Sequence, residues 1–151
     1  MSIFKKVFLF LLIAFVGIQF MPTTRNQSNE VLESDFTKTF NTPNNIQQLI
    51  GKPCYDCHSN NTKYPWYHKI QPVSWLLENH IKEGKKELNF SEFGTYSKRK
   101  QKSKLKSIIS QIEENKMPLS TYTLIHKDAK LSESDKELLT KWLTQLRDSL
   151  Q

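Results

Sequence analysis

The spacing of apolar residues predicts four helices in the part of the chain that follows residue 40. In each segment, apolar side chains recur three and four positions apart, which places them on one face of an α-helix. No segment has the alternation of apolar and polar residues that is typical of a half-buried strand. The predicted fold class is therefore all-α. The apolar positions are, in chain order, Ile46, Leu49, Ile50, Val73, Leu76, Leu77, Ile81, Leu105, Ile108, Ile109, Ile112, Leu138, Leu139, Trp142, Leu143 and Leu146.

Residues that start and stop helices delimit these segments. The first helix is predicted over residues 42–50, because Gly51 and Pro53 are typical of a helix end. The second is predicted over residues 72–84, from a proline to a glycine. The last helix follows residues 132–135, whose order Ser-Glu-Ser-Asp predicts a capping box.

The amino-terminal segment, residues 1–21, is apolar and preceded by positive charge. Lys5 and Lys6 come before an unbroken apolar run over residues 7–18. This order is typical of an export signal, and the lysines orient the start of the chain toward the cytoplasm. Because bulky residues follow the run where a signal peptidase prefers small ones, we expect a retained single-pass membrane anchor. A signal peptide removed near residue 22 is the alternative, and either leaves the domain on the periplasmic side.

The remaining chain divides into a polar segment and one domain. Residues 22–39 are rich in Ser, Asn and Thr and lack periodicity, so they are predicted to be a polar tether. Residues 40–147 are long enough for one domain. Only 37% of the whole chain is hydrophobic, and a domain this polar would gain from burying a large apolar cofactor.

The two cysteines of the chain lie in the sequence Cys54-Tyr55-Asp56-Cys57-His58. This C-x-x-C-H spacing is the attachment sequence of c-type haem. Two thiols on one helical turn can each add to a haem vinyl group, while the adjacent imidazole reaches the iron. We expect a backbone carbonyl between Pro65 and Pro72 to hold the other ring nitrogen of His58.

Three other uses of the cysteines remain open. A thioredoxin-like dithiol would need a βαβ pattern, which the surrounding sequence lacks. A closed zinc site would need four ligands, and His68, His80 and His126 show no paired spacing. A disulfide between Cys54 and Cys57 would close too small a loop to constrain much of the unfolded chain.

Met117 is the candidate for the second axial ligand. It precedes Pro118 in a loop that leads into the last helix, and the proline favours an extended backbone at Met117. A thioether is a soft, neutral donor that suits ferrous iron. The alternatives are that Met117 only fills a gap in the core, or that His80 ligates the iron instead. His68 and His126 lie in polar contexts and are expected to be exposed.

Positive charge is concentrated before the third helix. The chain carries a formal net charge of +7, and six basic residues fall within residues 98–106. Nucleic acid is not expected as the partner of an exported protein. A solvated helix face is the simplest explanation of the run. The functional alternative is docking to an acidic redox partner protein or to anionic headgroups, because positive charge speeds such encounters.

Several sequence segments together resemble the bacterial haem-binding domain family of short exported proteins. They are Cys54-Tyr55-Asp56-Cys57-His58-Ser59-Asn60, Tyr64-Pro65-Trp66-Tyr67, Ile70-Gln71-Pro72-Val73, Leu88-Asn89-Phe90-Ser91, Met117-Pro118 and Leu131-Ser132 through Trp142. The family is similar to class I c-type cytochromes in motif order. The resemblance implies a small cytochrome c-like helical domain wrapped around one haem c. It also implies thioether attachment at Cys54 and Cys57, with His58 as proximal and Met117 as distal ligand.

Two functions follow from these features. The first is a monohaem electron carrier in the periplasm, in which a six-coordinate iron changes redox state without enzymatic chemistry. The second is a haem-based sensor or a peroxidase-like enzyme, which needs a distal ligand that is absent or easily displaced. Because no paired Arg and His adjoin a clear distal position, the sequence favours the electron carrier over an enzyme.

Overall fold

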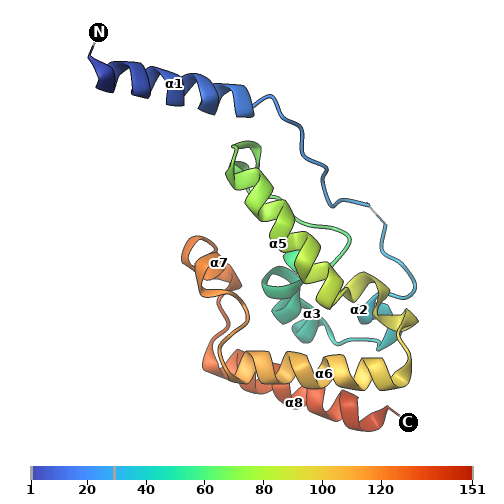
Figure 1. Ribbon diagram of the computed structural model, residues 1–151. Helices are drawn as coiled ribbons and strands as arrows, with labels where there is room; N and C mark the ends of the chain where they lie inside the picture. Colours follow the sequence, from blue (N-terminus) through green and yellow to red (C-terminus); the bar gives the residue numbers. More distant parts are fainter. Residues whose placement is uncertain (1, 29, 151) are drawn as a thin grey trace.

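The computed structural model describes residues 2–28 and 30–150, and this part of the chain folds into helices without a β-strand (Figure 1). One isolated bridge, between Gln27 and Asn61, is its only β-type pairing. The prediction of an all-α domain is confirmed. The elements are α1 (Ile3–Ile18), α2 (Phe36–Thr39), α3 (Asn44–Ile50), the π-helix η1 (Gly51–Tyr55), α4 (Asp56–His58), the 3₁₀-helix η2 (Trp66–Lys69), α5 (Val73–Glu87), the 3₁₀-helix η3 (Phe90–Thr95), α6 (Lys98–Glu113), α7 (Ser120–Ile125), the 3₁₀-helix η4 (Lys127–Ala129) and α8 (Glu133–Ser149).

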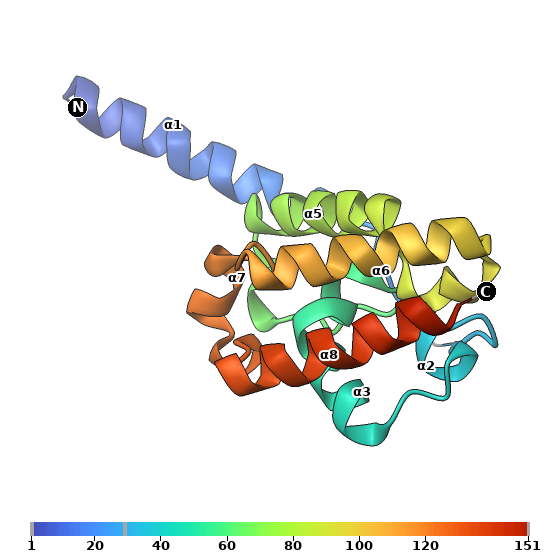
Figure 2. The same cartoon turned by 90° about the horizontal axis from the view of Figure 1, so that it is seen from below.

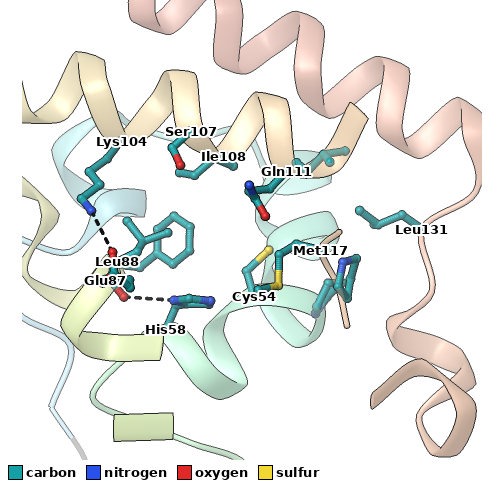
Figure 3. A pocket seen from close by; sticks show the side chains of 14 residues that line it. Cys54, His58, Glu87, Leu88, Lys104, Ser107, Ile108, Gln111, Met117 and Leu131 are labelled. Carbon is teal, nitrogen blue, oxygen red and sulfur yellow. Dashed lines mark hydrogen bonds and ion pairs between the residues drawn. The ribbon is translucent and has the colours of Figure 1, made fainter. Parts of the chain in front are cut away.

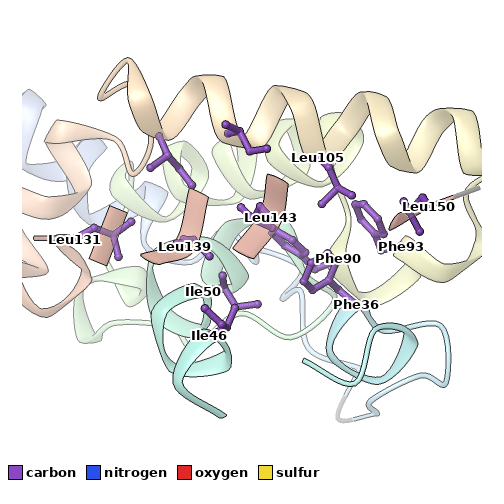
Figure 4. Close-up of a cluster of buried hydrophobic side chains, with 12 residues drawn as sticks. Phe36, Ile46, Ile50, Phe90, Phe93, Leu105, Leu131, Leu139, Leu143 and Leu150 are labelled. Atoms are coloured by element: carbon purple, nitrogen blue, oxygen red, sulfur yellow. The ribbon is translucent and has the colours of Figure 1, made fainter. Parts of the chain in front are cut away.

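The core lies between the α6–α8 pair and the segments that cover it (Figures 2 and 4). Most of the predicted apolar residues of α6 and α8 are buried or partly buried there, and Leu105 and Leu139 are fully inaccessible to solvent, whereas Leu138 is 43% exposed. From α3 come Ile46 and Ile50, which are also buried. Burial of such side chains stabilises the fold by roughly 1.5–3 kcal/mol each. The helix α8 begins as predicted, because the Ser132 hydroxyl and the Asp135 carboxylate cap each other's backbone amides.

The amino-terminal apolar segment forms the helix α1, which has 16 residues and no buried side chain. At 1.5 Å per residue it is about 24 Å long, against about 30 Å for the hydrocarbon core of a bilayer. Across residues 2–28 and 30–150, no helix has both the length and the apolar character needed to cross a membrane. The prediction of a single-pass anchor is therefore not supported, because the helix already ends at Ile18. The side chain of the next residue, Gln19, is hydrogen-bonded to the backbone of Gln71.

The segment predicted to be a polar tether, residues 22–39, is in contact with the domain. Asn26 donates hydrogen bonds to the Ser59 carbonyl and the Thr62 hydroxyl. Further along, Asp35 caps the short helix α2. Phe36 is completely buried, and its ring packs edge-on against the aromatic rings of Phe40, Phe90, Phe93 and Trp142. One apolar residue in a polar segment therefore anchors the segment in the core, although it produces no periodic pattern.

The first domain helix does not stop at Gly51 as predicted. The chain continues through the π-helix η1 and into α4 without leaving helical geometry. Pro53 lies inside η1, and a proline has no N–H for the regular α-helical hydrogen bond. A wider π-turn accommodates this gap, and such turns are frequent at functional sites. The consequence is that Cys54, Cys57 and His58 are carried on one continuous helical segment.

Candidate functional site

The imidazole of His58 is oriented by two backbone carbonyls. Its Nδ1 lies 2.8 Å from the Gly84 oxygen and 3.1 Å from the Leu88 oxygen. Because both partners only accept hydrogen bonds, Nδ1 must carry the proton, and the neutral ring then keeps a free lone pair on Nε2. Burial is the main cause that lowers the pKa of His58, and this also favours the neutral form. A neutral imidazole with a fixed Nδ1–H is the form in which histidine binds a metal ion.

The expected backbone carbonyl is present, but it comes from the end of α5 and not from residues 65–72. The helix α5 reaches this position because it contains Gly84, the residue predicted to end it. A Cβ atom at Gly84 would lie 3.0 Å from the Cys57 carbonyl oxygen and 3.4 Å from His58 Cε1. Glycine therefore permits α5 to pack directly on the C-x-x-C-H segment. In the sequence, this contact is indicated only by a glycine, Gly84, among the lysine and glutamate residues of α5.

Both cysteines are free thiols at half-buried positions. Burial, followed by the nearby Cys57, raises the pKa of Cys54 to about 12. Burial, followed by Asp56, raises the pKa of Cys57 to about 11. Neutral thiols of this kind differ from the low-pKa thiolates of redox-active C-x-x-C motifs. Among the described residues, no group of three or more His, Cys, Asp or Glu side chains is arranged to hold a metal ion.

Two adjoining cavities of about 280 and 410 Å³ lie beside His58. Both are lined by His58 and Met117. Cys54 lines the smaller cavity (Figure 3), and Cys57 lines the larger one. The four residues singled out in the sequence therefore all line these two cavities. The other wall residues are mainly apolar and include Leu88, Phe90, Ile108, Ile112, Val73, Leu76, Leu77, Leu119 and Ile125.

The apolar face of α5 lines the larger cavity instead of the core. Val73 and Leu76 are 40% and 59% exposed, although both belong to the predicted apolar stripe. Of that stripe only Ile81 is buried. An amphipathic helix with its apolar face open to a cavity is typical of a site that takes a large apolar ligand. The cavity walls and the donor set of His58 and Met117 fit an iron porphyrin.

The loop before α7 brings Met117 to the cavities. The helix α6 ends at Glu113, and Asn115 has a left-handed backbone with φ of 56°. The amides of Lys116 and Met117 both donate to the Gln111 carbonyl, which closes the turn. Asparagine tolerates this conformation at a helix end better than most residues.

His80, the alternative distal ligand, also lines the larger cavity and lies on an exposed turn of α5.

A polar cluster connects the loop containing Met117 to the C-x-x-C-H segment. The Tyr122 hydroxyl in α7 donates to Asp56 Oδ2 at 2.7 Å. His126 stacks on the Tyr122 ring and is hydrogen-bonded to the Tyr67 hydroxyl at 2.7 Å. Burial raises the pKa of Asp56, while the Tyr122 hydrogen bond opposes this effect. Sequence reasoning did not identify Asp56 and Tyr122, because their pairing joins segments 66 residues apart.

The expectation that His68 and His126 are exposed is wrong. His68 is only 9% exposed, and its Nδ1 lies 2.5 Å from the Pro65 carbonyl oxygen. His126 is half-buried between Tyr67 and Tyr122. Both rings are held by aromatic neighbours, and polar residues beside them in sequence gave no indication of these contacts.

The basic run at the start of α6 is largely solvated, as predicted for the simplest explanation. Lys98, Arg99, Lys100, Lys102 and Lys106 are all exposed. Lys104 differs from them, because its side chain is only 26% exposed and pairs with Glu87 at 3.7 Å.

A family model described as a haem-binding domain matches residues 13–145 of this chain. No curated protein and no solved structure matches. The matched range includes the whole of the site described above, together with the segment before residue 40 that packs on the domain.

Proposed function

Because the chain belongs to the haem-binding domain family, we propose that it is a monohaem c-type cytochrome-like protein that carries single electrons. Family membership makes it a haem-binding protein. The finer assignment is covalent attachment through Cys54 and Cys57, with His58 as proximal and Met117 as distal ligand. A haem bound there supplies one-electron exchange at its iron.

The orientation of His58 is the observation that carries this proposal. Its Nδ1–H is directed at two carbonyl oxygens, so Nε2 is available to a metal. The iron of a porphyrin in the adjoining cavities would meet this nitrogen, and the Met117 thioether lies along the same cavities. In thioether formation each thiol adds across a vinyl group. The sulfur bonds to one vinyl carbon and the thiol hydrogen goes to the other, so no external oxidant is needed.

The cellular location follows from the chemistry of haem attachment. Thioether attachment takes place on the far side of the cytoplasmic membrane, so we propose that the domain over residues 40–147 works in the periplasm.

The exposed basic run of α6 is suited to an acidic redox partner protein, because complementary charge accelerates encounter. Electron transfer to such a partner should slow as ionic strength rises, whereas a rate independent of salt would remove this surface from the proposal.

An optical spectrum of protein produced with the c-type maturation machinery tests the assignment. We expect a low-spin spectrum, and pigment that stays with the protein in acid acetone. Release of the pigment would contradict thioether attachment. A high-spin iron that binds carbon monoxide at once would instead favour the haem-based sensor or the peroxidase-like enzyme, in which the distal ligand is displaceable.

A further inference from the structure

The smaller cavity has a polar stripe on α6 that the proposed ligation does not use. Lys104, Ser107 and Gln111 all line it, three and four positions apart on one helix face. Next to them on the same helix, Ile108 and Ile112 supply apolar wall. Among the described residues, neither the Ser107 hydroxyl nor the Gln111 side-chain amide has a hydrogen-bond partner from the protein. A set of unpaired donors beside a cation is suited to a carboxylate.

Lys104 differs from the other basic residues of α6 in where its side chain lies. In the described part of the chain it is the only lysine or arginine that lines either cavity. Its stem is largely covered, whereas its basic neighbours on α6 are exposed. A lysine that lies along apolar surface can keep its ammonium group at the mouth of a pocket. Glu87, its partner at 3.7 Å, is 77% exposed, and a pair of this kind is weak.

The order of residues along the cavity decides which part of a haem meets Lys104. Figure 3 shows Lys104 and Glu87 on one side of His58 and Cys54 on the other. The vinyl and carboxylate groups of haem lie at opposite edges of the ring. If the vinyl edge is at the cysteines and the iron at His58, the carboxylate edge points toward Lys104.

We propose that Lys104, assisted by Ser107 and Gln111, binds a carboxylate of the haem and thereby fixes the rotation of the ring in the cavity. This inference rests on the proposed haem site. The lysine exchanges its loose pair with Glu87 for a carboxylate that is held in place by the rest of the ring. No proton or electron is transferred in this step.

The test compares haem with its dimethyl ester, in which both carboxylates are neutral. The full-length apoprotein, made without maturation machinery, is titrated with ferric haem and with the ferric ester. We expect Lys104→Gln to weaken haem binding about fivefold or more, as for a partly buried charged contact, and ester binding less than twofold. Lys104→Arg should retain most of the haem affinity.

Two further variants separate this role from structural effects. Lys106→Gln removes an equivalent charge from an exposed position of the same helix and should leave both affinities unchanged. Glu87→Gln removes the partner of Lys104 and should not weaken haem binding. Equal loss for haem and ester in Lys104→Gln, no loss for either, or the same loss in Glu87→Gln, would overturn the proposal. If the unaltered chain binds neither compound, the haem site itself is rejected, and this inference with it.

Discussion

The substitution Gly84→Ala tests whether close packing of α5 on the C-x-x-C-H segment positions His58. The added methyl carbon would lie 3.0 Å from the Cys57 carbonyl oxygen and 3.4 Å from His58 Cε1. The first contact is with backbone, so α5 must shift by a few tenths of an ångström. Overpacking of this kind costs about 1–3 kcal/mol, whereas replacing a helical glycine by alanine contributes about 1 kcal/mol in the opposite direction. We expect a net loss of about 1 kcal/mol in the free energy of unfolding.

The assay is urea unfolding of the haem-loaded protein, combined with its ferric absorption spectrum. Because α5 and its C-cap residue Leu88 supply the two carbonyls, the shift should disturb the hydrogen bonds of His58 Nδ1 and broaden or displace the ligand-sensitive bands. Gly51→Ala is the matched control, since a Cβ at Gly51 would have no atom within 4 Å. A Gly84→Ala protein that is as stable as the unaltered chain, with the same spectrum, would show that close packing at Gly84 does not position His58.

Four further substitutions test the distal ligand, the position of α7 and the packing of residues 22–39. Met117→Ala should give a high-spin iron that binds carbon monoxide, while His80→Ala should not; the reverse pattern in the carbon monoxide titration would transfer the distal ligand to His80. Tyr122→Phe leaves the buried Asp56 carboxylate without its hydroxyl partner and should lower the free energy of unfolding by about 1–3 kcal/mol in urea titrations. An unchanged midpoint would show that this hydrogen bond does not hold α7. Phe36→Ala should cost about 3–5 kcal/mol, because the ring is fully buried; a loss under 1 kcal/mol in the same titrations would support the prediction that residues 22–39 are a tether.

The helical part of the fold could be predicted wherever apolar residues repeat. The faces of α6 and α8 have this property, and the capping box at Ser132 marks the start of α8. The role of Phe36 could not be predicted, because one buried ring in a polar segment has no period. The path through Gly51 and Pro53 was also missed, since both residues usually end helices and the π-turn that accommodates them has no distinct sequence signature.

The site also contains residues that the sequence predicts and residues that it does not. Cys54, Cys57 and His58 are adjacent in sequence, so their common position follows from local geometry alone. Met117 could be proposed from its place before Pro118 and the last helix. The partners that orient the site come from distant segments, as with the Gly84 carbonyl at His58 and the Tyr122 hydroxyl at Asp56. Such pairings depend on tertiary packing, which a single sequence does not specify.

Covalent attachment of haem to Cys54 and Cys57 can be measured by mass spectrometry of the protein from a host with c-type maturation. We expect the denatured protein, full-length or processed, to carry the added mass of one haem, and the proteolytic peptide that contains both cysteines and His58 to carry it too. The same protein with Cys54→Ala and Cys57→Ala should lack the added mass. Unmodified thiols at both positions in protein from such a host would show that haem is not attached at these cysteines.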